Sequence, residues 1–216
     1  DVIEIGVPFT DPIAEGPVIQ KAHDRALKNN ISLPDIIKLV EQFRESDNTT
    51  PVILMGYLNT FSFHKNIIDK SDENGVDAVL VVDIPGELSI SSYGISNPNI
   101  DSISLISPTT SEDRIKKIAE NGSGFIYYVT LRGVTGSSNL DVDEININIQ
   151  KIRSYSDIPT LAGFGIKSNE DAKLLSEYSD GVIVGSSIVE MIHKESDSKQ
   201  FDRIGAYLRE LKEAIS

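Results

Sequence analysis

Short apolar runs rich in β-branched residues alternate along the chain with segments of helical periodicity. This alternation is typical of parallel βα units, in which a helix returns the chain to the same edge of the sheet. Seven runs predict strands: Asp1–Val7, Pro51–Tyr57, Asp77–Ile84, Ile100–Ile106, Gly124–Thr130, Pro159–Gly165 and Gly181–Ser186. Helices are predicted at Val18–Asn29, Pro34–Arg44, Lys65–Asn74, Ser111–Asn121, Val142–Tyr155, Asn169–Tyr178, Ser187–His193 and Phe201–Ile215.

Serine residues stand just before three of these predicted helices. Ser32, Ser111 and Ser168 each occupy a position from which a side-chain oxygen can accept a hydrogen bond from the first helical turn. The segment Gly86–Pro98 is different, because Ser, Gly and Asn dominate it. We expect a short, frayed or irregular connection there.

The number of predicted strands decides the architecture. A closed βα barrel needs eight strands, and an open parallel edge would expose unpaired backbone groups. The sequence starts with Asp1 directly in a strand. We therefore expect an α/β protein with a (β/α)8 TIM barrel fold, in which residues 1–216 are a single, N-terminally incomplete domain that lacks the first βα unit. A doubly wound open sheet of seven strands is the alternative.

Composition narrows the possible partners. The 216 residues include 20 Lys and Arg against 33 Asp and Glu, which gives a net charge of −13. This charge disfavours binding to nucleic acid or to an anionic membrane. A small anion such as phosphate would have to be bound locally, by backbone N–H groups.

The chain has no cysteine, so it has no disulfide framework and no thiolate zinc site, which weakly favours a cytoplasmic location. No stretch approaches the apolar length of a membrane span. The three histidines, His23, His64 and His193, are far apart without ligand spacing. We predict no metal site and expect all three on the solvated surface, without a role in catalysis.

Three carboxylates near the start of the chain are candidate functional groups. Glu4 lies within a predicted buried strand, and Asp11 and Glu15 lie in the proline-punctuated loop that follows. A charged group in a buried strand costs several kcal/mol unless it is paired or functional. Buried acids cluster at active sites. The structural alternative is that Glu4 pairs with a lysine of a neighbouring strand or lies at a hydrated edge.

Glycine-containing turns follow three consecutive predicted strands late in the chain. They are Gly133–Gly136, Gly163–Gly165 and Gly185–Ser187. Glycine lets the backbone approach a ligand closely, so that several N–H groups can converge on one phosphate. The last turn also leads into a helix N-terminus, which favours an anion. Each turn alone fits an ordinary tight turn, but the three together indicate the phosphate site that barrels place after their last strands.

Six segments, in this order, give the chain a resemblance to the tryptophan synthase alpha subunit family: GVPFTDPIAEGPVIQ, LMGYLN, VLVVDIP, RGVTG, GFGI and GSSIV. The resemblance covers essentially the whole sequence. It implies an eightfold βα barrel and a lyase that splits indole-3-glycerol phosphate into indole and glyceraldehyde 3-phosphate, without a metal or an organic cofactor.

The resemblance also assigns catalytic roles. By similarity, Glu4 is the acid and base that handles the protons of indole C3 and of the glycerol hydroxyl, and Tyr127 hydrogen-bonds it. Glu15 stands where the family most often has an aspartate, the partner of the indole N–H. Two carboxylates can divide such work if their environments separate their pKa values. Thr135 matches a threonine that reaches Glu15 when its loop closes, and Arg132–Asn139 has the composition of a lid.

The remaining matches fall into two sets. The phosphate-binding turns are matched by Gly136, Gly165, Gly185 and Ser186. The indole pocket is matched by Met55, Tyr57, Leu80, Val82, Ile106 and Phe164. Ordinary barrel core is the alternative for each aliphatic member, since strand residues of a barrel alternate inward in any case.

The resemblance further implies a partner, a beta subunit that carries pyridoxal phosphate, in an alpha2beta2 heterotetramer. Asp11, with Pro8–Pro12, and Asn59 would face this partner. Two other functions stay open from the residues: a catalytically weak activator of the beta subunit that binds a phosphate ligand, and a different phosphate-binding barrel, such as an isomerase of histidine or tryptophan biosynthesis.

Overall fold

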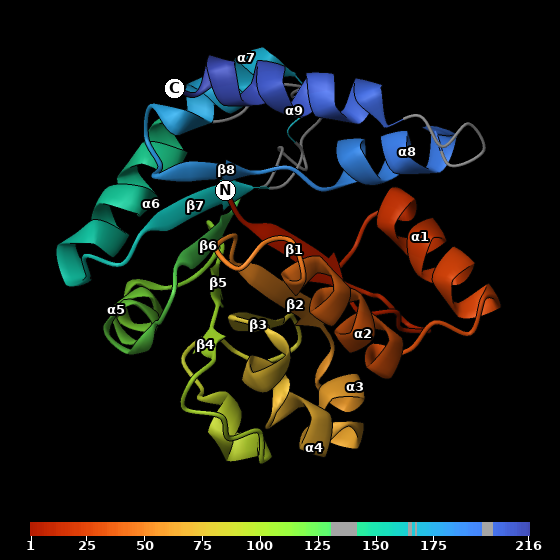
Figure 1. The fold of residues 1–216 in the computed structure, drawn as a ribbon. Coiled ribbons are helices and arrows are strands. Elements are labelled where there is room, and N and C mark those ends of the chain that lie inside the picture. The colour runs from red at the N-terminus through yellow and green to blue at the C-terminus, as the bar shows by residue number, and fades with distance from the viewer. Residues whose placement is uncertain (131–141, 164–165, 167, 196–200) are drawn as a thin grey trace. The chain divides into compact units, whose positions relative to one another are not determined.

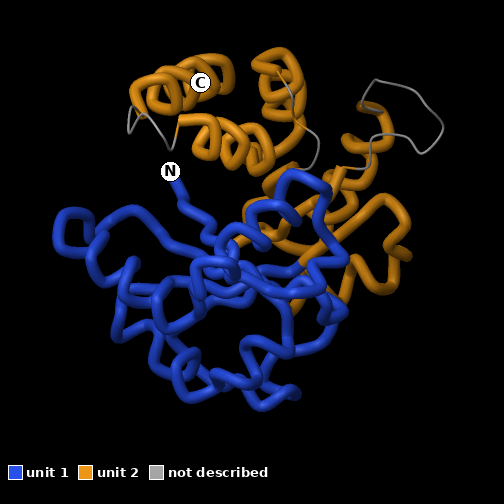
Figure 2. Tube along the Cα trace, turned by 90° about the vertical axis from the view of Figure 1, so that its right-hand side faces the viewer, with its two compact units in different colours: residues 1–104, 122–124 blue, residues 105–121, 125–216 orange. Residues whose placement is uncertain are grey.

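The computed structural model describes residues 1–130, 142–163, 166, 168–195 and 201–216 (Figure 1). These residues form two compact units, shown in different colours in Figure 2. Unit 1 contains Asp1–Ser104 together with Gly122–Gly124, and unit 2 contains Leu105–Asn121 together with Phe125–Ser216. That residues 1–216 form a single domain stays a prediction.

Unit 1 is built on a parallel sheet in the order β1-β2-β3-β4. Its strands are β1 (Ile3–Gly6), β2 (Val52–Gly56), β3 (Ala78–Val81) and β4 (Asp101–Ser102). Glu4 is opposite Ile53 of β2, and Met55 is opposite Leu80 of β3. Because all neighbours are parallel, the strand ends of this sheet point to one edge, where the loops that follow β1, β2 and β3 begin.

Helices connect the strands of unit 1. They are α1 (Pro17–Lys28), α2 (Leu33–Arg44), α3 (Leu58–Phe63), α4 (Lys65–Ile68) and the 3₁₀ helices η1 (Ser71–Asn74) and η2 (Ile90–Tyr93). The predicted helix Lys65–Asn74 is wrong in extent, since α4 and η1 are separate short turns, and α3 was not predicted. The Gly86–Pro98 segment is irregular as expected and contains only the single turn η2.

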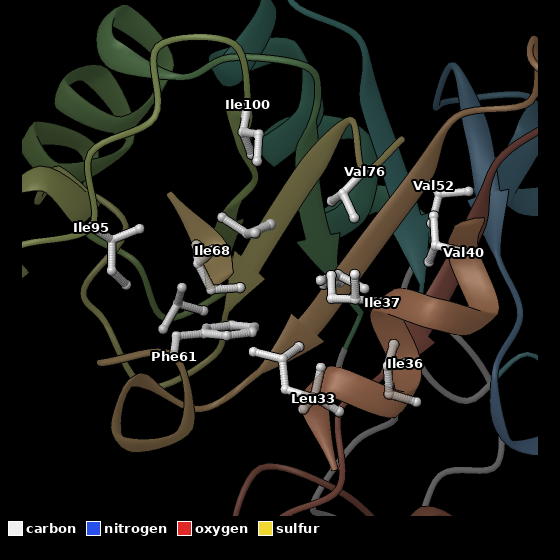
Figure 3. Packing of buried hydrophobic residues seen from close by; sticks show 14 of the residues in the cluster. Leu33, Ile36, Ile37, Val40, Val52, Phe61, Ile68, Val76, Ile95 and Ile100 are labelled. Atoms are coloured by element: carbon white, nitrogen blue, oxygen red, sulfur yellow. The ribbon is translucent and has the colours of Figure 1, made fainter. Parts of the chain in front are cut away.

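The core of unit 1 lies between α2 and the sheet (Figure 3). Leu33, Ile36, Ile37 and Val40 recur at helical spacing and are all buried. They share one hydrophobic cluster with buried strand residues such as Val52. Ser32 is the N-cap residue of α2, as predicted, and forms a capping box with Asp35, whose carboxylate accepts from both the backbone N–H and the hydroxyl of Ser32.

Unit 2 is built on a second parallel sheet in the order β5-β6-β7-β8. Its strands are β5 (Ser104–Ile106), β6 (Ile126–Val129), β7 (Thr160–Gly163) and β8 (Gly181–Ile183). Its helices are α5 (Glu112–Asn121), α6 (Val142–Tyr155), α7 (Asn169–Ser176), α8 (Ser186–Glu195) and α9 (Asp202–Ala214). Ile118, Ile126, Ile149 and Ala162 are fully buried in its hydrophobic cluster. The predicted cap at Ser168 is confirmed, because its hydroxyl accepts from the Asp171 N–H at 3.1 Å.

The predicted strand Ile100–Ile106 is two short strands in the structure. β4 pairs with β3, whereas β5 belongs to the sheet of β6. Between them, the N–H of Ile103 still donates to the carbonyl of Val79 at 2.9 Å. The other six predicted strands are confirmed in place, so the seven predicted runs correspond to the eight strands β1–β8 of the described residues.

Candidate active site

Glu4 occupies the middle of β1, where it is half-buried. Burial raises the pKa of its carboxyl group to about 7, because desolvation penalises the charged form. A carboxyl group that titrates near neutral pH can act both as a proton donor and as a proton acceptor there. The environment of Glu4 is therefore that of a general acid and base.

The same burial predicts a pH-dependent stability. Between the ordinary pKa of a glutamate and about pH 7, the folded state holds a proton on Glu4 that the unfolded state has lost, so the contribution of Glu4 to stability falls as pH rises through this window. In Glu4→Gln this loss is absent. We expect the free energy of unfolding of the variant, relative to the parent, to rise by about 3 kcal/mol between pH 4.5 and pH 8. Urea denaturation at both pH values measures it.

Asp11→Asn is the control for that experiment, because Asp11 is an exposed acid in the loop after the same strand. It shows how far the removal of an exposed acid alone changes the pH dependence of stability. A Glu4→Gln protein with the same pH dependence as the parent would show that Glu4 is not desolvated.

Glu15 lies in the loop between β1 and α1, and its side chain is only 7% exposed. The Tyr57 hydroxyl donates a hydrogen bond to Glu15 Oε2 and accepts one from the N–H of Ala14 at 3.0 Å. Tyr57 is buried, at the N-cap position of α3. Burial and the hydrogen bond to Glu15 raise the pKa of the Tyr57 phenol well above its ordinary value. The hydroxyl therefore stays protonated and holds one oxygen of the carboxylate.

His23 of α1 contradicts the expectation of a solvated surface residue. It is 7% exposed, and its Nε2 lies 4.0 Å from Glu15 Oε1. A sequence signal for this burial existed, because Ile19, Ala22, His23 and Ala26 share one face of α1 at helical spacing. The surface prediction is confirmed for His193, which is exposed, whereas His64 is half-buried.

The unit 1 residues predicted for the indole pocket lie at the carboxyl ends of β2 and β3. Leu80 is fully buried, Met55 is half-buried on β2, and Val82 is half-buried just after β3. Tyr57 follows β2 directly and contacts Glu15 as described. Of these four residues, only Tyr57 forms a hydrogen bond to a candidate catalytic group. The roles of all four in the indole pocket stay predictions.

Unit 2 carries the remaining described candidates. Tyr127 of β6 is half-buried, and a Cβ atom at Gly163 would lie 2.8 Å from its hydroxyl. Only a glycine therefore fits at the end of β7 without moving this ring. Ile106 is fully buried within the hydrophobic cluster of this unit.

Gly185 and Ser186 form the start of α8. Both are exposed, no atom lies within 4 Å of a Cβ built on Gly185, and Ser186 begins the helix. The free N–H groups and the dipole of a helix N-terminus favour an anion at such a place. This geometry suits the phosphate-binding role predicted for the two residues. Four further candidates lie outside the described residues, namely Thr135, Gly136, Phe164 and Gly165, and so does the predicted lid Arg132–Asn139.

The described residues contain neither a candidate metal site nor a candidate membrane span. No group of three or more His, Cys, Asp and Glu side chains in this part of the chain could hold a metal ion. Within the same residues, every helix is too short or too polar to cross a membrane.

The residues predicted to face a partner are exposed. Asp11 lies in the loop after β1, and Asn59 lies on α3. Two large hydrophobic side chains near them in sequence are also exposed, Ile13 to 85% and Phe63 to 83%. The partner-facing role of these segments stays a prediction.

Comparison with known proteins gives one consistent result. The family model described as tryptophan synthase alpha chain matches residues 1–216. The chain is 47% identical to the tryptophan synthase alpha chain of Neisseria gonorrhoeae over 218 residues, which cover all of this chain and 83% of the relative.

Solved structures that are similar to this chain belong to the same family. Tryptophan synthase subunit alpha from Legionella pneumophila is similar with a TM-score of 0.85 at 37% identity, over 100% of this chain and 81% of that one. A chain of the tryptophan synthase complex from Pyrococcus furiosus is similar with a TM-score of 0.76 at 32% identity, over 90% of this chain and 79% of that one. These similarities confirm the predicted fold class, an α/β TIM barrel.

Proposed function

The chain belongs to the tryptophan synthase alpha chain family, and from this membership we propose that Glu4 and Glu15 carry out the family's cleavage of indole-3-glycerol phosphate to indole and glyceraldehyde 3-phosphate. The lyase activity and the place in tryptophan biosynthesis follow from the family. The assignment of the two glutamates rests on one observation above all: Glu4 is a half-buried strand carboxyl whose pKa lies near 7.

The proposed reaction is a retro-aldol cleavage with two proton transfers. Protonated Glu4 adds its proton to indole C3, which leaves the ring nitrogen with a positive charge. The Glu4 carboxylate then takes the proton of the glycerol hydroxyl. At the same time the bond between indole C3 and the carbon that bears this hydroxyl breaks. The electron pair of that bond restores the indole ring, and the hydroxyl carbon becomes the aldehyde. One carboxyl group with a pKa of about 7 can serve both steps, because both of its protonation states are populated.

Glu15 is proposed to act on the indole N–H. Its carboxylate is held by the Tyr57 hydroxyl, and the side chain is buried. An anion next to the ring nitrogen stabilises the positive charge that forms when C3 is protonated. Glu15 therefore supplies electrostatic stabilisation while Glu4 moves the protons.

Substrate phosphate is proposed to bind at the start of α8. Backbone N–H groups at Gly185 and Ser186 can bind an anion without a basic side chain, which suits a chain with a net charge of −13. Gly136, Gly165 and Thr135 remain proposed members of this substrate site. Phe164 remains a proposed member of the indole pocket, together with Met55, Leu80, Val82 and Ile106.

A beta subunit is the partner that the family implies, and we propose that it binds at Asp11 and Asn59 to form an alpha2beta2 heterotetramer. Pyridoxal phosphate would belong to that partner, and this chain would work without a cofactor. Exposed Ile13 and Phe63 support this surface, because buried aromatic and aliphatic anchors supply most of the energy of an interface. The cytoplasmic location stays a prediction.

Phe63→Ala is expected to weaken binding of the beta subunit about tenfold, since it removes a large anchor from the proposed surface. Isothermal titration of the beta subunit into each variant measures the change. Phe201→Ala is the matched control, because Phe201 is an exposed phenylalanine of unit 2. Equal affinities for the two variants would place the partner elsewhere.

Indole release tests the proposed function directly. Purified protein is mixed with indole-3-glycerol phosphate, with and without a beta subunit, and indole is quantified. Release of indole that is lost in Glu4→Gln supports the proposal. No release together with stimulation of the beta subunit would instead indicate an activator, and conversion of a phosphorylated sugar without indole would indicate an isomerase.

A further inference from the structure

The loop between β1 and α1 is attached near both of its ends to one side chain. His23 Nδ1 accepts a hydrogen bond from the backbone N–H of Phe9 at 2.9 Å. On the other edge of the ring, Nε2 lies 4.0 Å from Glu15 Oε1, and both side chains are 7% exposed. The imidazole is therefore hydrogen-bonded to the beginning of the loop and lies next to the carboxylate at its end, beyond direct hydrogen-bond distance.

The hydrogen bond from Phe9 also determines the protonation of this ring. A nitrogen that accepts an N–H cannot carry a proton, so the proton of the neutral imidazole is on Nε2 and faces Glu15. Burial lowers the pKa of His23, against the opposing effect of the Glu15 and Asp24 charges. A neutral imidazole with its proton on Nε2 offers a donor on the edge of the ring that is nearest to Glu15.

A second set of contacts holds Glu15 from the other side. The Tyr57 hydroxyl donates to Glu15 Oε2, and the Tyr57 ring stacks on Phe9 with centroids 4.7 Å apart and an interplanar angle of 21°. Phe9 in turn donates its N–H to His23. Phe9, Tyr57, Glu15 and His23 thus form one cluster within unit 1, in which the phenol holds the carboxylate and the imidazole lies beside it at 4.0 Å.

We propose that His23 is a positioning residue for Glu15, one that fixes the direction of the carboxylate through Nε2 and the course of the loop through Nδ1. The proposal rests on the proposed function, in which Glu15 acts on the indole N–H. Glutamate has three side-chain torsions, so a carboxylate at this place needs more than one contact to keep a single direction. Misplacement of a reacting group by about 1 Å can cost on the order of 10²-fold in rate.

Three substitutions separate the two edges of the ring. His23→Leu removes both polar contacts. His23→Asn keeps an acceptor near the Nδ1 position for the Phe9 N–H, and His23→Gln keeps a donor near the Nε2 position for Glu15. We expect kcat for indole release to fall roughly 30-fold in His23→Leu and His23→Asn, with KM changed less than threefold, and to recover to within about fivefold of the parent in His23→Gln.

The denaturation midpoints of the three His23 variants should follow a different order from their kcat values. His23→Asn is expected to recover most of the denaturation midpoint lost in His23→Leu, because it retains the acceptor for the loop, whereas His23→Gln recovers less. Lys28→Gln, on the exposed last turn of the same helix, should leave both quantities unchanged. Activities that simply follow the denaturation midpoints, or a His23→Leu enzyme with the kcat of the parent, would overturn the proposal.

A readout without substrate separates this proposal from the function on which it rests. Nitrogen-15 NMR of the parent at pH 7.5 reports the tautomer of each histidine, and we expect His23 to carry its only ring proton on Nε2. A proton on Nδ1, or on both nitrogens, would overturn the positioning role even if indole is released. Failure of the parent to release indole, with the expected tautomer present, would count against the proposed reaction alone.

Discussion

Glu4→Gln is expected to lower the rate of indole release by roughly 10³-fold, because glutamine can neither donate a proton to C3 nor accept one from the hydroxyl. The amide keeps the size of the carboxyl group, so substrate affinity should change little. Single-turnover indole release and a separate binding measurement with a non-reacting indole phosphate analogue distinguish the two effects.

Loss of activity through unfolding is not expected in this variant. The half-buried carboxyl destabilises the fold when it is charged, so Glu4→Gln should be at least as stable as the parent at pH 8. An inactive and more stable protein is the signature of a group kept for chemistry at the expense of stability. A Glu4→Gln enzyme that retains more than about a tenth of the parental rate would remove Glu4 from the mechanism.

Phe61→Ala is expected to lower the free energy of unfolding by about 4 kcal/mol, within the range for a phenylalanine removed from a packed core. Phe61 is fully buried in the hydrophobic cluster of unit 1 (Figure 3). Its ring lies against β2, since a Cβ on Gly56 would come within 2.9 Å of it. Such close contact with the backbone leaves a cavity that the strand cannot fill. Urea denaturation monitored by circular dichroism measures the loss.

The same helix provides a matched control. Phe63 is 83% exposed on α3, two residues from Phe61. Phe63→Ala should therefore change the free energy of unfolding by less than about 0.5 kcal/mol. Equal losses for the two variants would contradict the burial pattern of α3.

Activity should also fall in Phe61→Ala, for a local reason. The N–H of Phe61 donates to the carbonyl of Tyr57, whose side chain hydroxyl holds Glu15. The Phe61 ring thus anchors the turn of helix from which Tyr57 reaches the candidate site.

Strands and long amphipathic helices could be predicted from the sequence because their hydrophobic periods are strong. The α2 helix shows this: four buried residues at helical spacing, begun by Ser32, match the prediction to one residue. By contrast, α3 has only six residues and begins at Leu58, with Tyr57 as the single residue between it and β2. A segment this short has too few turns for a period, and its order comes from the burial of Phe61 instead.

The candidate site was only partly predictable. Glu4 could be identified because a lone carboxylate interrupts an apolar run, and Glu15 because its loop carries the family motif. His23 was missed, since one polar residue on a helix is compatible with either the surface or the core. Its burial depends on the loop that folds back over α1 and donates the Phe9 N–H, a tertiary contact across 14 residues.

Gly122–Gly124 limit where this protein can be divided into two pieces. These three residues belong to unit 1, although helix α5 before them and strand β6 after them belong to unit 2. Ser123 Oγ accepts the N–H of Ser102 at 2.9 Å, and Gly124, at φ +66°, lies against Ile103 and Asp101. A recombinant half that stops at Ser104 would leave its last strand without this acceptor and this covering segment. A break before α5 thus takes Gly122–Gly124 from unit 1, and a break after Gly124 takes α5 from unit 2, so neither break gives two complete units.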